Sequence, residues 1–261
     1  MQRQVFMKRT WAVVCLVILT LAVVNSAQAS DFGGVYVGVN LGGASGGSNA
    51  TTTTIFSPTG YFAMTSPPAI AIAGAQKLSP SSAVGGGQAG GNFQIGPFVL
   101  GGEIDFGHMQ LSKQQSKSGI YPCCPTTGFT VTQSVRTDWL FTARPRVGVA
   151  FHRVLFYGTG GLAVTNFDYK ARFDDTFATA TENGRVNENR KGWIAGGGVE
   201  FRIAHHWSVK GEVLHADFGS VTTTSTNLMA FTPPIAFPTN VWTHHASLKT
   251  TIGRMGINFR F

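Results

Sequence analysis

Charged side chains recur at even spacing in segments of this sequence that otherwise alternate with apolar residues. The pairs are Glu103 and Asp105, Arg144 and Arg146, Glu200 and Arg202, Lys210 and Glu212, and Arg254 and Arg260. Residues an even number apart on a β-strand point to the same face of a sheet. Each pair therefore lies opposite the apolar face of its own segment. Charges of both signs on one face of a sheet predict ion pairs across an enclosed interior.

We expect most of these side chains to form one ionic and hydrogen-bonded network inside a barrel. The predicted members are Glu103, Asp105, Arg144, Arg146, Glu200, Lys210, Glu212 and Arg254. Glu200 and Lys210 are equidistant from a turn at His205, which predicts a direct cross-strand pair. The network either plugs a narrow lumen or forms a charged constriction that passes ions. The plug is favoured, because unpaired charges in so narrow a space are costly.

Two glycine motifs resemble catalytic or nucleotide-binding patterns. Gly43–Gly47 fits G-x-S-x-G with Ser45 as the candidate nucleophile, and Gly85–Gly90 fits G-x-G-x-x-G. Both patterns require a helix directly after the glycines. No helix is evident after either segment, so we interpret the first as the start of a loop and the second as small residues in a crowded barrel wall. We predict no enzymatic activity.

Histidine pairs raise the question of a metal or haem site. His244 and His245 lie near the end of the chain, where they could meet His108 or His215 at one rim of a barrel. Adjacent strand residues point to opposite faces, so neither side-by-side pair chelates a metal well by itself. Solvated histidines are the favoured interpretation, and we predict no cofactor.

Cys123 and Cys124 are adjacent and are bracketed by prolines. An exported protein meets oxidising conditions. A vicinal disulfide, an intermolecular bridge and free thiols all remain open from the sequence.

The elements that would position these residues are β-strands. Period-two alternation predicts strands near 33–43, 84–94, 97–109, 138–151, 154–166, 192–203, 207–218 and 247–261. Long connections rich in Thr, Ser, Pro and Gly cover roughly 44–83, 110–137, 167–191 and 219–246, and short turns lie near residues 95, 152 and 205. This order predicts an all-β, eight-stranded antiparallel up-and-down transmembrane barrel with four long extracellular loops.

Composition agrees with a membrane barrel. The chain has 261 residues, of which 43% are hydrophobic and only 12% are charged, with 33 Gly and 20 Phe. Soluble domains carry roughly 25% charged residues and about 7% Gly. The mean hydropathy of +0.08 is too low for a bundle of membrane helices. An ordinary soluble enzyme and a disordered chain are both disfavoured.

Residues 1–29 have the properties of a secretory signal peptide, and residues 30–261 form the predicted barrel domain. A basic start with Arg3, Lys8 and Arg9 precedes an apolar run, and Ala27–Ala29 is a small-residue cleavage site. Cleavage would lower the formal net charge from +8 to +5, since it removes three cations. The mature protein is therefore predicted to be exported and mildly basic.

Several strand segments resemble a known family of barrels. The segments are Gly34–Asn40, Gly101–Asp105, Tyr157–Ala163, Gly192–Trp193, Gly198–Phe201, Trp207–Glu212 and Asn258–Phe261. They are similar to the small alphaproteobacterial outer-membrane barrels of the surface-antigen or porin-like type, whose fold is like that of the OmpA membrane domain. The resemblance implies an outer-membrane location, and for some members haemin binding, envelope integrity or host contact. It supplies no catalytic residues.

The chain departs from the family pattern at Pro145. Proline cannot donate to the strand ladder, so we expect a local irregularity there. Phe259 and Phe261 resemble the carboxy-terminal signal that the barrel-assembly machinery recognises, and they are equally suited to an aromatic girdle facing lipid.

The sequence as a whole favours a non-enzymatic outer-membrane protein that contributes to envelope structure and makes surface contact through its loops. A small porin or a haem-binding surface protein is the alternative. The expected partners are outer-membrane lipid, the assembly machinery and a host or surface ligand. No nucleic-acid partner is expected.

Overall fold

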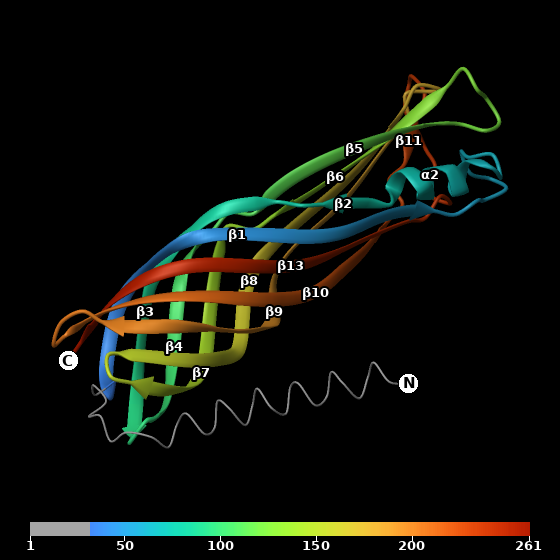
Figure 1. Ribbon diagram of the computed structural model, residues 1–261. Helices are drawn as coiled ribbons and strands as arrows, with labels where there is room; N and C mark the ends of the chain where they lie inside the picture. The colour runs from blue at the N-terminus through green and yellow to red at the C-terminus, as the bar shows by residue number, and fades with distance from the viewer. Residues whose placement is uncertain (1–31) are drawn as a thin grey trace, which may run out of the picture.

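The computed structural model describes residues 32–261, so the predicted signal peptide lies outside the described residues. Long strands curve around a common interior and continue into an extension at the end away from the C terminus (Figure 1). No helix in residues 32–261 is long and apolar enough to cross a membrane.

The described residues form thirteen strands and one helix. The strands are β1 (Gly34–Thr54), β2 (Gln76–Leu78), β3 (Ser81–Ile95), β4 (Phe98–Met109), β5 (Ser112–Ile120), β6 (Gly128–Arg136), β7 (Trp139–Phe151), β8 (Val154–Asp175), β9 (Thr181–Arg202), β10 (Trp207–Ser225), β11 (Met229–Ala230), β12 (Ile235–Ala236) and β13 (Trp242–Arg260). The helix is α2 (Ser66–Gly74).

The long strands are antiparallel and pair in a closed order. The pairing runs β9–β10–β13–β1–β3–β4–β7–β8, and β8 pairs again with β9. The first and last strands meet along their whole length, from Tyr36 opposite Arg260 to Thr54 opposite Trp242. The predicted all-β, antiparallel, up-and-down sheet is therefore confirmed.

Short turns join these strands at one end of the sheet, which we call the turn end. Gly96 and His152 lie in two of these turns with φ of 57° and 51°. Tight two-residue hairpins require such positive φ values. The opposite end, where the longer connections lie, is the loop end.

The long connections differ in part from the prediction, and the described residues form thirteen strands, so the count of eight is not confirmed. β1 continues to Thr54, β8 continues to Asp175, and β5 and β6 form a hairpin within 110–137. The β6 strand of that hairpin pairs with β8, from Phe129 opposite Asp175 to Arg136 opposite Asp168. These segments are rich in threonine, which is favourable in strands, but their polar composition made them look like loops.

The two faces of the long strands differ in chemistry. Large apolar side chains point outward and are exposed, among them Leu41, Ile104, Val147, Val213 and Met255. The buried inner face carries charged groups near the turn end and an apolar cluster beyond them that includes Met109, Leu140, Leu214 and Ile252. A soluble sheet protein has its apolar residues inside, so this reversed arrangement suits a strand facing lipid.

The loop end has an aromatic core of its own. Phe62, Tyr121, Phe129, Phe173 and Trp242 are buried there together. Their rings meet at centroid distances of 4.8 Å for Phe173 and Trp242 and 4.9 Å for Tyr121 and Phe129. The extension is therefore a packed structure that continues the sheet.

The ladder between β7 and β8 is interrupted where the sequence predicts an irregularity. Ala143 pairs with Leu162 and Arg146 pairs with Thr159, but neither Arg144 nor Pro145 has a partner on β8. The register is the same on both sides of the gap. Proline has no N–H to donate, which accounts for the missing pairs.

Candidate functional site

The eight predicted network residues lie together in the interior near the turn end. They come from four sectors of the closed sheet: Glu103 and Asp105 from β4, Arg144 and Arg146 from β7, Glu200, Lys210 and Glu212 from β9 and β10, and Arg254 from β13. Each is 6% exposed or less. With four carboxylates and four cations, the set has no formal net charge. We call these eight residues the lumen network.

Arg144 and Arg254 connect the carboxylates across the interior. Arg144 Nη2 lies 2.7 Å from Glu103 Oε1 and 2.9 Å from Asp105 Oδ2. Arg254 places Nε 2.6 Å from Glu212 Oε1 and Nη2 2.8 Å from Asp105 Oδ2. Each guanidinium thus binds two carboxylates through several of its planar donors. Those bound by Arg144 at these distances both lie on β4, whereas those bound by Arg254 lie on β4 and β10.

Lys210 does not contact the partner that the sequence predicts. Its register is as expected, since Lys210 stands directly opposite Glu200. Its ammonium instead lies 2.7 Å and 2.8 Å from the two oxygens of Glu103. The long lysine side chain thus reaches across the interior to Glu103, which also binds Arg144 at 2.7 Å.

Glu200 anchors the network nearer the turn end. Its Oε2 lies 2.6 Å from Arg146 Nη2, and its Oε1 accepts hydrogen bonds from Ser208 at 2.7 Å and Arg260 at 3.1 Å. Arg260 was recognised as inward-facing but was left out of the predicted network. Arg260 lies on the same face of its strand as Arg254, and this shared face could have predicted that Arg260 belongs to the network.

Two tyrosines complete the network and were missed by the sequence analysis. Tyr36 Oη donates to Glu103 Oε2 at 2.7 Å, and Tyr157 Oη donates to Glu212 Oε2 at 3.1 Å. The Arg146 guanidinium lies 4.6 Å from the Tyr157 ring centroid and 5.3 Å from that of Tyr36. They lie on β1 and β8, which carry none of the eight predicted charges, so the parity of charged residues could not have predicted their place in the network.

Glycine makes room for these tyrosines. A Cβ at Gly90 would lie 2.4 Å from Tyr36 Oη, and one at Gly198 would lie 2.7 Å from Tyr157 Oη. The crowded wall predicted for Gly85–Gly90 is thus observed where β3 passes Tyr36. This segment is a strand that continues to Ile95, without the helix that a dinucleotide site requires.

Beyond the lumen network, towards the loop end, the interior is closed by apolar side chains. A void of about 10 Å³ lies at the boundary, lined by Asp105 and Arg254 on one side and by Met109, Leu140 and Ile252 on the other. A cavity of this size holds at most about one water molecule. The two layers together leave little room at this boundary for a hydrated ion.

The remaining candidates are dispersed. Ser45 lies exposed in the middle of β1, with Thr251 and Ser81 as its strand neighbours. The G-x-S-x-G segment therefore lacks the strand-to-helix turn of a nucleophile elbow.

The histidines do not gather at one rim. His244 is buried, with Nδ1 3.1 Å from Thr52 Oγ1 and Nε2 3.1 Å from Glu182 Oε1. His245 lies on the other face beside Thr222, and His215 lies beside Thr251. Within residues 32–261 there is no cluster of three or more His, Cys, Asp or Glu side chains that could hold a metal ion.

Cys123 and Cys124 are free thiols at the loop end, with their sulfur atoms 2.8 Å apart. The hydrogen bond to Cys123 raises the pKa of the Cys124 thiol.

Phe259 and Phe261 lie at the turn end on the outer face, where Phe259 packs against Trp207 with ring centroids 5.1 Å apart. Phe261 is 73% exposed.

Comparison with known proteins agrees with this architecture. The model of the outer membrane protein beta-barrel domain family matches residues 13–232. The chain belongs to this family. It is an outer-membrane protein, as the alternation of its strands and its family resemblance predicted.

The chain is similar to the 31 kDa outer-membrane immunogenic proteins of Brucella melitensis and Brucella suis. The identity is 32% over 153 residues, which are 57% of this chain and 59% of each relative. The chain thus spans somewhat more than half the length of these relatives. The similarity supports the predicted resemblance to alphaproteobacterial surface-antigen barrels.

Solved structures of outer-membrane proteins are also similar to this chain. The outer membrane protein OprG from Pseudomonas aeruginosa matches with a TM-score of 0.44 and 10% identity, covering 88% of this chain and 97% of OprG. The outer membrane protease OmpT from Escherichia coli matches with a TM-score of 0.41 and 9% identity, covering 92% of this chain and all of OmpT.

Proposed function

We propose that the closed cycle of eight strands is a membrane-spanning barrel whose lumen is plugged, and that the protein has no enzymatic role. It would stabilise the envelope and present the loop-end extension for surface contact. The observation that carries this proposal is the electroneutral lumen network, buried across the interior and followed by an apolar layer.

The outer face supports the membrane-spanning part of the proposal. Its exposed side chains at Leu41, Ile104 and Val147 are apolar, while the charges of the same strands point inward. An arginine or lysine facing lipid at mid-bilayer costs about 2–4 kcal/mol, so this separation is what a lipid environment selects. Since β1 and β13 begin and end at the turn end, that end would face the periplasm and the extension would face the exterior.

The lumen network supports a structural role over conduction. A conducting constriction needs mobile, hydrated space, whereas each predicted charge here already has a partner of opposite sign. An eight-stranded barrel has an interior just wide enough for side chains to fill. The proposed partners are outer-membrane lipid along the outer face, the barrel-assembly machinery at Phe259 and Phe261, and a host or surface ligand at the extension.

Liposome swelling tests the proposal against the porin alternative. Refolded mature chain is reconstituted and challenged with a pentose and with KCl, and an established general porin serves as the positive control. A plugged barrel gives no swelling above empty liposomes. Swelling at the rate of the porin would overturn the proposal.

The surface role is tested separately by removing the β5–β6 hairpin, residues 112–136, from the expressed protein. If surface contact uses the extension, binding of intact bacteria to host cells or matrix falls while heat-shifted gel mobility shows a folded barrel. Unchanged binding would mean that the β5–β6 hairpin does not mediate contact.

A further inference from the structure

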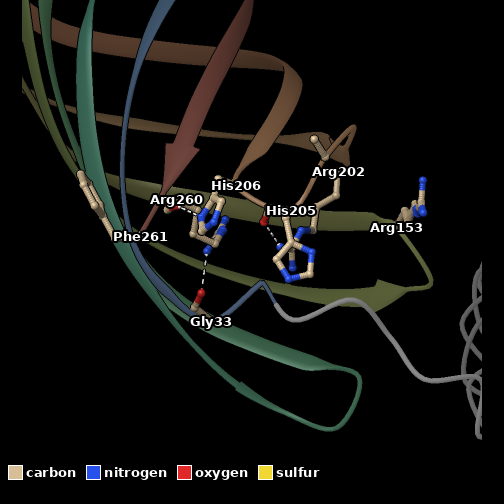
Figure 2. A pocket seen from close by; sticks show the side chains of 8 residues that line it. Gly33, Arg153, Arg202, His205, His206, Arg260 and Phe261 are labelled. Atoms are coloured by element: carbon tan, nitrogen blue, oxygen red, sulfur yellow. Dashed lines mark hydrogen bonds between the residues drawn. The ribbon is translucent and has the colours of Figure 1, made fainter.

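A basic pocket lies at the turn end of the barrel, on the far side of the lumen network from the apolar layer. Its volume is about 440 Å³. Its lining includes Gly33, Phe261 and five basic residues. We call its five basic residues, Arg153, Arg202, His205, His206 and Arg260, the mouth cluster (Figure 2).

Backbone hydrogen bonds between separate chain segments hold the mouth cluster together. Arg202 N donates to Arg153 O at 2.9 Å, which joins the end of β9 to the β7–β8 turn. Arg260 N donates to His206 O at 2.7 Å, which joins the end of β13 to the β9–β10 turn. Three chain segments thus bring their cations to one cavity through bonds that do not depend on the cationic groups themselves.

Two of the arginines are oriented by further contacts. Arg202 Nη2 donates to His205 O, and Arg260 Nη1 donates to Gly33 O at 3.1 Å (Figure 2). Both guanidinium groups also lie near the Phe32 ring, at 6.0 Å and 5.8 Å from its centroid. Arginines fixed in this way lose little conformational freedom when they bind a ligand.

The pocket has an excess of positive charge. Among the described residues that line it, three are arginines and none has a carboxylate side chain. Phe261 adds one terminal carboxylate, so the formal charge of the lining stays positive. The nearest acid in the hydrogen-bond network is Glu200, which accepts from Arg260 at 3.1 Å and is already bound at 2.6 Å by Arg146. Arg153 is exposed and Arg202 is half-buried, so the positive region reaches solvent.

The rim beside the pocket is apolar on its outer side. Phe261 itself lines the pocket and is 73% exposed, and the nearby Ile203 is 48% exposed. A cavity that combines guanidinium groups with an adjoining apolar wall fits an amphiphile with an anionic head. It fits a free anion less well, because the apolar wall would then stay uncovered.

We propose that the mouth cluster binds a phosphate group, and that the phosphate is the headgroup of a phospholipid of the inner leaflet. Guanidinium groups match phosphate oxygens with paired, charge-assisted hydrogen bonds. The acyl chains would lie along the apolar rim at Phe261 and Ile203. The site is separate from the extracellular extension, and it does not depend on whether the lumen conducts.

Native mass spectrometry of the detergent-refolded mature chain tests this proposal. The probes are phosphatidylglycerol and a diacylglycerol with the same acyl chains, each with and without inorganic phosphate as competitor. The variant is Arg153→Gln combined with Arg202→Gln. The matched control is Arg172→Gln, which removes an exposed cation at the other end of the protein. Heat-shifted gel mobility checks that each variant is folded. A further variant, Arg153→Lys, keeps the positive charge of residue 153.

The proposal predicts that phosphatidylglycerol binds the wild type and that diacylglycerol does not. Retention of phosphatidylglycerol by the double variant falls about tenfold, as expected for the loss of hydrogen bonds to a charged group. It is unchanged in Arg172→Gln and largely kept in Arg153→Lys. Equal retention by the folded double variant and the wild type would overturn the site. If phosphate binds at the arginines but phospholipid binds no better than diacylglycerol, the lipid source is wrong and a free phosphate is the ligand.

Discussion

Glu103 shows how single residues hold the lumen network. It accepts hydrogen bonds from Arg144 on β7, Lys210 on β10 and Tyr36 on β1, at 2.7 Å in each case. A carboxylate taken out of water is stable only with such partners, and the attraction is strong because water does not screen it. The bonds from one residue therefore fix the neighbouring strand β7 and two strands, β10 and β1, that are not neighbours of β4 in the sheet.

Replacing Arg144 by alanine removes a cation shared by Glu103 and Asp105. Breaking one partner out of a buried pair costs about 3–5 kcal/mol of unfolding free energy, because a buried charge is left without compensation. Urea unfolding in lipid vesicles measures the change. Arg172→Ala, which removes an exposed pair with Asp174, is the control and is expected to cost no more than about 1 kcal/mol. Equal stability of Arg144→Ala and wild type would contradict the network.

The tyrosine positions are tested through glycine. In Gly90→Ala the new methyl group would lie 2.4 Å from Tyr36 Oη and 2.6 Å from the backbone oxygen of Gly102, so the tyrosine must shift away from Glu103 or β3 must move away from β4. Overpacking of this kind costs about 1–3 kcal/mol. Gly87→Ala on the same strand is the control, since a Cβ there meets nothing within 4 Å. If both variants unfold alike, the close approach of Tyr36 to β3 is not constraining.

At the scale of elements, the extension depends on an aspartate at the end of β8. Asp175 Oδ2 accepts hydrogen bonds from Tyr61 Oη at 2.5 Å and from Tyr121 Oη at 2.9 Å. Its Oδ1 accepts from the N–H of Ala180 at 2.8 Å. One carboxylate thus joins the segment before α2, the β5–β6 hairpin and the β8–β9 turn.

This arrangement predicts a pH dependence of the extension. Burial, reinforced by Asp175, raises the pKa of Tyr61 and Tyr121 above the ordinary value near 10. In the opened extension these hydroxyls lose their protons above about pH 10, while in the closed form they keep them. The stabilisation is therefore complete below pH 10 and declines as the pH rises beyond it.

Hydrogen exchange of residues 112–136 between pH 8 and pH 11.5, corrected for the intrinsic rate, measures the opening. The extension is expected to lose protection above pH 10 while β4 and β7 keep theirs. The double variant Tyr61→Phe and Tyr121→Phe lacks both hydroxyls and should show no such step. A step of the same size in that variant would contradict the proposed cause.

Period-two alternation was enough to predict which face of each strand is charged, because parity depends only on strand geometry. It placed all eight network residues on the inner side. It did not predict the partner of Lys210, since the choice between Glu200 and Glu103 depends on distances across the interior. The strand extensions were missed because threonine-rich alternation, as in Thr51–Thr54, resembles a polar loop when no apolar face marks the strand.

For the whole molecule, the distribution of polar and apolar groups defines an orientation. The apolar outer face lies between the basic turn end and the packed extension, and the termini of β1 and β13 share the turn end. Phe259 and Phe261 lie there, which agrees with the proposal that the assembly machinery meets the last strand on the periplasmic side.

Phe261→Ala is expected to lower the amount of folded barrel in the outer membrane several-fold with little change in the stability of the barrel once folded. The reason is that Phe261 is 73% exposed and contributes little to packing. Phe98→Ala, which removes another exposed phenylalanine at 61%, is the control. Heat-shifted gel mobility of membrane fractions measures the folded amount. A similar loss in both variants would mean that Phe261 acts only as a lipid-facing side chain.

Single-channel recording of the refolded mature chain in a planar bilayer tests the plugged lumen most directly. The folded wild type is expected to be silent in 1 M KCl, because the lumen network and the apolar layer above it fill the interior. Discrete conductance steps from the folded wild type, growing larger in Arg144→Ala, would contradict the plug and identify the network as a constriction.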